Sequence, residues 1–218
     1  MTAPATDHRK RLLDALESTL AEKRYREITL TDLTSAARVS RRSFYEHFPN
    51  KDECLLSLAR DTSQRIMQRI ISSYSPSDDW PKVVSNATSA YMNFVDQHPS
   101  LMYALYIEVA ALGHDGFELR RDIAGTFARF LSAQTVQRAE AGELPETLSE
   151  AEAIALVAGI NELLFQRLME QTNNSQTSTL TETRSSKNRD DNKGGCSQAS
   201  GLVDLEATAQ RLILRMTQ

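Results

Sequence analysis

The 218-residue sequence predicts an all-α fold, and three observations support this. Apolar residues recur three or four positions apart over long segments, as they do on the buried face of an amphipathic helix. Pro49, Pro76 and Pro99 mark breaks between these segments. No stretch of strand length alternates apolar and polar residues, so the sequence gives no support for a sheet. With 40% hydrophobic and 25% charged residues, the chain is long enough for one or two ordinary globular domains.

Two short helices are predicted over residues 30–37 and 41–47. Thr29 can cap the first, because its hydroxyl accepts a free backbone N–H and Asp32 places a negative charge at the positive helix end. Ser40 can cap the second, which Pro49 prevents from continuing. A turn of about three residues between them fits a crossed helix pair. The segment therefore predicts a helix-turn-helix that docks on DNA.

The helix expected over 41–47 is the one that would enter the major groove. Side chains in the first turn of such a helix reach base edges, where arginine pairs bidentately with guanine, and a phenol or imidazole one turn later can donate to phosphate. The candidates are Arg41, Arg42, Ser43, Tyr45 and His47. Phe44 and Phe48 lie on the opposite side, so we expect them in the core.

Further helices follow to the end of the chain. Asn50 and Glu53 open one that runs to about residue 73, and others are expected over about 78–97 and 101–112. Residues 113–116 turn the chain, a helix runs to about residue 141, and Ser149 with Glu152 caps the next one. Residues 171–201 are rich in polar side chains and are expected to form a disordered loop. A final amphipathic helix is expected over 202–216.

The stretch VSRRSFYEHFPNKDECL resembles the helix-turn-helix of the TetR family of bacterial transcription regulators. The family pattern is roughly V-S-x-x-x-[FL]-Y-x-[HY]-F-x-[SN]-K-x-x-L, and the match continues upstream through Leu12, Leu16, Leu20, Tyr25, Thr29 and Leu33. The resemblance covers about fifty residues and implies an all-helical homodimer. Its N-terminal helix-turn-helix domain, residues 1–50, would bind double-stranded DNA, and residues 51–218 would form the effector-binding and dimerisation domain.

The resemblance also implies particular residues. Carried over by position, the DNA contacts would come from Thr29, Thr31, Ser40, Arg41, Arg42, Ser43, Tyr45, His47 and Lys51. The last two helices would form a four-helix interface with the partner, where Ala155, Ala158 and Gly159 allow close approach; closure of the chain's own core is the alternative. The implied function is a ligand-responsive transcriptional regulator, a repressor that binds an inverted-repeat operator. A dimeric ligand- or protein-binding module that has lost sequence-specific DNA binding is the alternative.

Three arginines depart from the family pattern. Arg24, Arg38 and Arg42 stand where glycine is common in relatives. Positions 24 and 38 end helices, where a left-handed residue is often needed, and a side chain there costs about 1 kcal/mol unless the cap is built differently. Arg42 replaces a small residue and predicts a changed operator preference or docking angle, with a solvated surface arginine as the alternative.

Charge and composition constrain the location and partners of the protein. Residues 1–50 hold nine Lys or Arg against seven Asp or Glu, whereas the whole chain has a net charge of −4, so the N-terminal end favours DNA. A basic arm, residues 8–11, precedes the first expected helix and either reaches DNA or frays. No run of 18 apolar residues and no signal peptide is present, so we expect a cytoplasmic protein without membrane contact.

Catalytic and metal-binding patterns are absent from the sequence. It contains no glycine-rich phosphate loop, no G-x-S-x-G, no H-E-x-x-H and no clustered metal ligands, so we expect neither an enzyme nor a cofactor nor a metal site. Cys54 and Cys196 have no C-x-x-C spacing and support no structural disulfide. Cys54 is better explained by helix packing than by redox sensing.

Aromatic residues at helical spacings suggest where a small-molecule effector of unknown identity would bind. Such residues line apolar pockets, and they also simply fill cores, so both interpretations stay open. Glu108 lies in otherwise apolar surroundings and would meet a cationic ligand or pair with an arginine. The candidate ligand-binding residues are Tyr91, Phe94, Tyr103, Tyr106, Glu108, Phe127 and Phe165.

Overall fold

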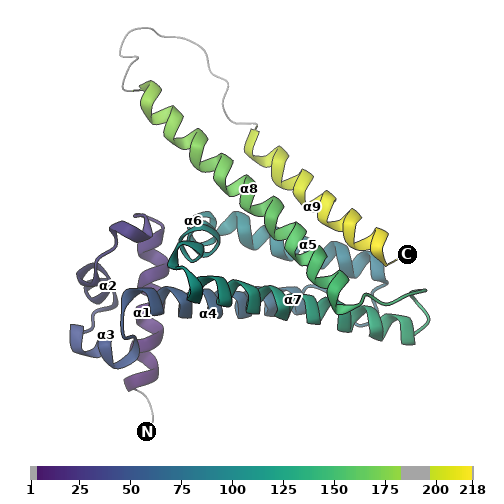
Figure 1. The fold of residues 1–218 in the computed structure, drawn as a ribbon, viewed down its shortest axis with the longest axis horizontal. Coiled ribbons are helices and arrows are strands. Elements are labelled where there is room, and N and C mark those ends of the chain that lie inside the picture. Colours follow the sequence, from purple (N-terminus) through teal and green to yellow (C-terminus); the bar gives the residue numbers. More distant parts are fainter. Residues whose placement is uncertain (1–3, 183–196, 218) are drawn as a thin grey trace. The chain divides into compact units, whose positions relative to one another are not determined.

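Helices make up the regular structure of the chain in the computed structural model, which describes residues 4–182 and 197–217 (Figure 1). In chain order they are α1 (Pro4–Leu20), α2 (Leu30–Ala37), α3 (Arg41–His47), α4 (Lys51–Ser72), α5 (Trp80–Gln97), α6 (Pro99–Tyr103), α7 (His114–Glu140), α8 (Glu150–Glu182) and α9 (Ser197–Met216). Short 3-10 helices cover Tyr25–Glu27 and Ala110–Leu112. No strand occurs in the described residues, and the predicted all-α fold is confirmed.

The chain forms two compact units. Unit 1 contains Met1–Arg69 and Phe94–Ile123, and unit 2 contains Ile70–Asn93 and Ala124–Gln218. This division differs from the boundary at residue 50 that the sequence predicts, because unit 1 includes most of α4 as well as α6. Leu55 and Leu58 of α4 are buried, and an apolar helix face must be covered by its neighbours. The helix-turn-helix therefore shares its compact unit with α4 and α6.

Leucines of α1 that are four residues apart form part of the core of unit 1. Leu12 and Leu16 are fully buried, and α1 packs against both α2 and α3. Leu33 of α2 and Phe44 of α3 are fully buried as well. Each short helix thus contributes a large apolar side chain to a common core, which compensates for the low intrinsic stability of helices of this length.

The predicted caps of α2 and α3 are confirmed. Asp32 N donates to Thr29 Oγ1 at 3.2 Å, and Thr29 N donates in return to the Asp32 carboxylate at 2.8 Å. The backbone and hydroxyl hydrogen bonds from Thr29 lower the pKa of Asp32 to about 2. At α3, Ser43 N donates to Ser40 Oγ at 3.0 Å. The start of both helices is therefore determined by local polar chemistry.

The end of α2 confirms one of the two expected left-handed residues. Arg38 has φ 53° and ψ 46°, and Val39 N donates to Thr34 O at 3.0 Å, which closes the helix in a Schellman motif. The expectation was wrong for Arg24, whose φ of −66° and ψ of 145° are extended. Arg24 precedes a 3-10 helix and does not end α1, so it carries no left-handed strain.

Residues 99–116 differ from the single helix and glycine turn that the sequence predicts. α6 ends at Tyr103, and a π-helical turn, Ala104–Glu108, separates it from the 3-10 helix. Gly113 has φ 73°, and α7 already begins at His114. A Cβ at Gly116 would lie 1.9 Å from Val109 O, so glycine is required for this close approach. The segment therefore stays helical to Leu112, but its hydrogen bonding changes from α to π to 3-10 along the way.

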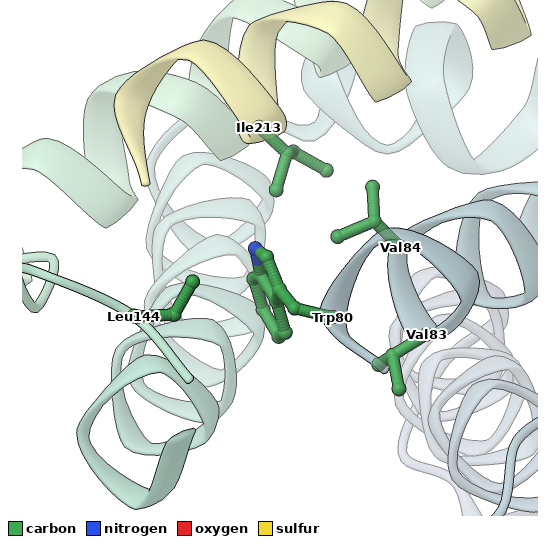
Figure 2. Packing of buried hydrophobic residues seen from close by; sticks show 5 residues of the cluster. All are labelled: Trp80, Val83, Val84, Leu144 and Ile213. Atoms are coloured by element: carbon green, nitrogen blue, oxygen red, sulfur yellow. The ribbon is translucent and has the colours of Figure 1, made fainter. Parts of the chain in front are cut away.

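A tryptophan-centred cluster joins α5 to the C-terminal helix within unit 2. Trp80, Val83 and Val84 of α5 are buried with Leu144 and Ile213 (Figure 2). Trp80 Nε1 donates to Thr217 Oγ1 at 2.8 Å, and both residues are buried. The indole therefore has its required partner, and α9 is held by packing against α5.

The long polar segment before α9 is partly helical. α8 continues to Glu182 and α9 begins at Ser197, so both helices enter the loop expected over 171–201. Residues 183–196 lie outside the described part of the chain. Extending an existing helix costs far less than nucleating one, which explains why a polar sequence continues α8. α8 and α9 contact each other (Figure 1). None of the described helices is long and apolar enough to cross a membrane.

We expect Arg38→Gly to raise the free energy of unfolding by about 1 kcal/mol, because glycine adopts the left-handed conformation without the Cβ clash. Denaturation followed by circular dichroism measures the change. Arg38→Ala is the matched control, because it removes the charged side chain but keeps Cβ, and its stability should stay near wild type. Equal stabilisation by both variants would contradict backbone strain as the cause.

Candidate nucleic-acid interface

The outer face of α3 carries exposed polar side chains. Phe44 and the C-cap residue Phe48 are buried beneath the helix, with ring centroids 5.7 Å apart. On the outer side, Arg42 Nε lies 3.2 Å from Glu46 Oε1, and the Arg42 side chain is 90% exposed. Tyr45 is 58% exposed. An arginine, a carboxylate and a phenol are therefore available to a partner on one face.

The flank of α3 that faces α2 is held by a hydrogen bond between side chains. Arg41 Nη2 donates to Thr31 Oγ1 at 2.6 Å, and both residues are exposed. Thr29 is exposed at the start of α2, although its hydroxyl already serves as the cap. Ser40 is exposed at the start of α3 and caps it in the same way. Both helix starts are therefore on the surface.

The opposite flank of α3 faces α1. Ser43 is only 7% exposed, and its hydroxyl lies 2.9 Å from His8 Nδ1. His47 is partly buried on the same flank, with its ring centroid 6.4 Å from that of His8. Ser43 was predicted as a base-contacting residue, but its hydroxyl is turned toward α1. Sequence reasoning missed His8 as its partner, because the two residues are 35 positions apart.

Lys51 is used within the protein. Its Nζ donates to Tyr25 O at 2.9 Å and to Ile28 O at 2.7 Å, and it lies 4.3 Å from the centroid of the Tyr25 ring. Burial lowers the pKa of Lys51, while the charges of Asp52 and Glu108 raise it. Two of its three N–H groups therefore hold the segment before α2, and the lysine predicted to contact DNA has a clear structural role.

The basic residues at the N-terminus form no separate arm, contrary to expectation, because residues 8–11 lie inside α1. Arg11 Nη2 donates to Ala37 O and to Arg38 O, the latter at 2.9 Å. These are carbonyls at the negative end of α2, where a cation is favourable. Lys10 pairs with Asp14 at 2.7 Å. The basic cluster thus supports the helix-turn-helix from within the domain.

The seven candidate ligand-binding residues are divided between the two units. Phe94, Tyr103, Tyr106 and Glu108 belong to unit 1, and Tyr91, Phe127 and Phe165 belong to unit 2. Three of the unit 1 rings lie against guanidinium groups: Arg69 is 5.2 Å from the Phe94 centroid, Arg24 is 4.2 Å from that of Tyr103, and Arg120 is 5.9 Å from that of Tyr106. The unit 1 aromatics therefore serve in part as supports for arginines.

Glu108 is the unusual member of this group. It is 6% exposed, and its Oε1 has no hydrogen-bond partner among the described residues. It ends the π-helical turn and acts electrostatically on both Tyr25 and Lys51. The arginine partner that the sequence offered as one alternative is not seen at Oε1 among the described residues.

The described residues contain neither a cluster of metal ligands nor a reactive thiol. No group of three or more His, Cys, Asp or Glu side chains that could hold a metal occurs within 4–182 and 197–217. Cys54 is fully buried, and burial raises the pKa of its thiol to about 12. A thiol of this kind is unreactive, which supports a packing role.

Comparison with known proteins agrees with the geometry of α2 and α3. Residues 12–58 match the model of the bacterial regulatory proteins, tetR family. A curated relative, described as the uncharacterized HTH-type transcriptional regulator YxbF of Bacillus subtilis strain 168, is 28% identical over 92 residues. That match covers 42% of this chain and 24% of the relative, so the chain spans about a quarter of the relative's length.

Solved structures with the same fold cover nearly the whole chain. The regulator FadR of Bacillus subtilis, in complex with stearoyl-CoA, has a TM-score of 0.69 at 16% identity over 96% of this chain and 99% of its own. FadR of Bacillus halodurans has a TM-score of 0.68 at 16% identity, covering 98% and 96%. A TetR-family regulator from Syntrophomonas wolfei has 0.70 at 15% identity, covering 97% of both chains. At such identities these similarities show the fold alone.

The family and its relatives are transcriptional regulators and not enzymes. The matched segment, residues 12–58, runs from the middle of α1 through α2 and α3 to the buried start of α4. The N-terminal segment therefore matches the tetR family of bacterial regulatory proteins, and the fold of nearly the entire chain is the one found in the TetR-family regulator from Syntrophomonas wolfei.

Proposed function

We propose that this protein is a ligand-responsive repressor that binds an inverted-repeat operator as a homodimer. The observation that carries the proposal is the outer face of α3, where Arg42 and Tyr45 are exposed above a fully buried Phe44. A short helix that presents an arginine in its first turn fits the major groove, where arginine contacts guanine O6 and N7.

The remaining contacts are assigned by side-chain chemistry. Arg41 and Arg42 would read base edges, whereas hydroxyl, phenol and imidazole groups suit phosphate oxygens. The proposed phosphate contacts are Thr29, Thr31, Ser40, Tyr45 and His47. Ser43 and Lys51 would act indirectly, since their polar atoms already bond to α1 and to the loop before α2.

An apolar surface on α8 and α9 supports the dimer. Ile154 and Met169 of α8 and Leu212 and Met216 of α9 are exposed large hydrophobic residues. Between the two α8 positions, Ala155, Ala158 and Gly159 are exposed as well. Small residues let helices approach closely, and helices of two protomers can bury these apolar side chains together.

Regulation would arise from a two-state equilibrium between conformations that differ in the separation of the two α3 helices. A ligand that prefers the state with the wrong separation weakens the simultaneous fit to two half-sites. FadR of Bacillus subtilis was solved with stearoyl-CoA, so acyl-coenzyme A compounds are the first effector class to test.

The purified wild-type protein should enrich an inverted repeat from a random duplex pool at physiological salt, with half-sites about one helical turn or a multiple apart. Arg42→Ala should lose about tenfold or more in affinity for the selected duplex and relax the preference at one base position. Sequencing of the retained DNA and titration of single duplexes measure both effects. Wild-type affinity should also fall steeply with salt.

Two outcomes of this experiment would contradict the proposal. Wild-type protein that retains no DNA at low salt would favour the binding module without sequence-specific DNA recognition. An Arg42→Ala variant that selects the same sequence with the same affinity would remove Arg42 from base recognition. Ser63→Ala on α4 is a matched control, since its hydroxyl donates to Arg60 O within the same helix.

Gly159→Glu should convert the dimer to a monomer while leaving the monomer folded. A Cβ at Gly159 meets nothing within 4 Å in this chain, so a side chain is tolerated there until a partner helix packs against it. A buried unpaired carboxylate then costs several kcal/mol at the interface. Sedimentation measures the mass and circular dichroism the helix content. Ala133→Glu on the exposed side of α7 is the control, and a dimeric Gly159→Glu variant would place the interface elsewhere.

Stearoyl-CoA at about 100 times its dissociation constant should stabilise the protein by about 2.7 kcal/mol, which corresponds to a rise of several degrees in Tm. The same ligand should weaken binding to the selected duplex. Free coenzyme A and free stearate are the controls, because they show whether the coenzyme A part or the acyl chain of stearoyl-CoA causes the stabilisation. A panel of amphipathic compounds without any shift in Tm would contradict a small-molecule effector.

A further inference from the structure

The rotation of α3 about its own axis determines which side chains reach DNA. The helix has only seven residues, and its inner face is set by the burial of Phe44. Apolar burial is non-directional, so it tolerates a roll of the helix. Hydrogen bonds are directional and weaken steeply as their angle falls. Polar contacts on the flanks of α3 are therefore what can define its roll.

Helical geometry divides α3 into an outer face and two flanks. Successive residues are about 100° apart, so with Phe44 pointing inward, Arg42 and Glu46 point outward. Their ion pair at 3.2 Å and the 90% exposure of Arg42 agree with this orientation. Ser43 and His47 share the flank toward α1, because residues four apart lie on one side of a helix.

The flank toward α1 is held by the more protected hydrogen bond. His8 Nδ1 and Ser43 Oγ lie 2.9 Å apart, and Ser43 is 7% exposed. The Ser43 hydroxyl donates when Nδ1 is unprotonated and accepts when it is protonated, so the pair suits either tautomer. The His8 and His47 rings meet at 83°, edge to face. By contrast, the bond between Arg41 and Thr31 on the other flank is exposed to competing water.

We propose that His8 is a positioning residue for sequence recognition, which sets the roll of α3 through Ser43 and thereby aims Arg42 at its base. This inference rests on the proposed DNA-binding function. His8 makes its contact on the flank of α3 that faces α1 and needs no contact with DNA itself. When the bond is lost, Phe44 stays buried and the exposed bond between Arg41 and Thr31 remains, so α3 keeps its place but its roll is less tightly held.

The test compares three variants of the full-length protein on the duplex that the wild type selects. His8→Leu removes the hydrogen-bonding group, and His8→Asn keeps one near the position of Nδ1. Ser43→Ala removes the other partner. Ser18→Ala, whose hydroxyl donates only to Ala15 O within α1, is the matched control. Each variant is titrated with the selected duplex and with a scrambled duplex of the same length, at a temperature where it is folded.

A positioning role predicts a loss of sequence discrimination. His8→Leu and Ser43→Ala should each bind the selected duplex about tenfold more weakly, the equivalent of one lost hydrogen bond. Binding to the scrambled duplex should be unchanged, because phosphate contacts carry it. The double variant should be no weaker than either single variant, since both remove the same bond. His8→Asn should recover most of the discrimination.

Other outcomes separate this inference from the function on which it rests. If the wild type selects no sequence, the proposed function fails. If the wild type selects a site and His8→Leu binds it with wild-type affinity, the function stands and the positioning role is wrong. Equal losses on selected and scrambled duplexes would also overturn it, because they would show a general loss of the folded domain.

Discussion

The burial of Phe44 is the constraint on which the arrangement of the DNA-binding domain depends. Burying a phenylalanine side chain contributes about 1.5–3 kcal/mol, more than the roughly 1 kcal/mol of a hydrogen bond at the surface. The inner face of α3 is therefore chosen by the apolar contact, and Arg42 and Glu46 become the outer face as a geometric consequence. The weaker polar contacts then select among the few rotations that this burial permits.

Two cationic side chains inside the domain stabilise its loops by donating hydrogen bonds to backbone carbonyls. Arg11 donates to the carbonyls of Ala37 and Arg38, and Lys51 donates to those of Tyr25 and Ile28. These carbonyls lie at chain turns, where backbone groups lack helical partners and must be satisfied otherwise. The Arg11 contact also explains how Arg38 keeps a left-handed conformation without glycine. Basic residues in this domain are thus divided between internal support and the exposed surface.

Glu108 lies outside the helix-turn-helix but acts on Lys51, one of the two cations that stabilise its loops. Its buried carboxylate ends the π-helical turn and acts on Lys51, which bonds to the loop before α2. Arg24 of that loop lies 4.2 Å from the centroid of the Tyr103 ring, at the end of α6. Both contacts lie within unit 1. The loop before α2 therefore depends on residues far along the chain, and the unit is larger than the matched family segment.

Local patterns were sufficient for most helix boundaries and for the helix-turn-helix. Thr29, Ser40 and Pro49 act through groups within a few residues, so α2 and α3 were predicted with their observed bounds. The same locality explains the left-handed Arg38. Prediction missed the change of helix type after Tyr103 and the start of α7 at His114. Gly116 there lies too close to Val109 O for a Cβ, and such a backbone approach has no signature in the spacing of apolar residues. Local patterns also could not predict that the candidate ligand-binding residues are divided between two units, because each unit combines segments far apart in the sequence.

The sequence by itself determined the fold class, the helix-turn-helix and the outward arginine of α3, because helical periodicity and caps act over a few residues. Only the tertiary structure decided that Ser43 turns toward His8, that Lys51 bonds to the backbone and that Arg11 bonds to the end of α2. These contacts join residues 23 to 35 positions apart, and no local spacing specifies which of several polar side chains will meet. Their partners are chosen by how α1, α2 and α3 pack.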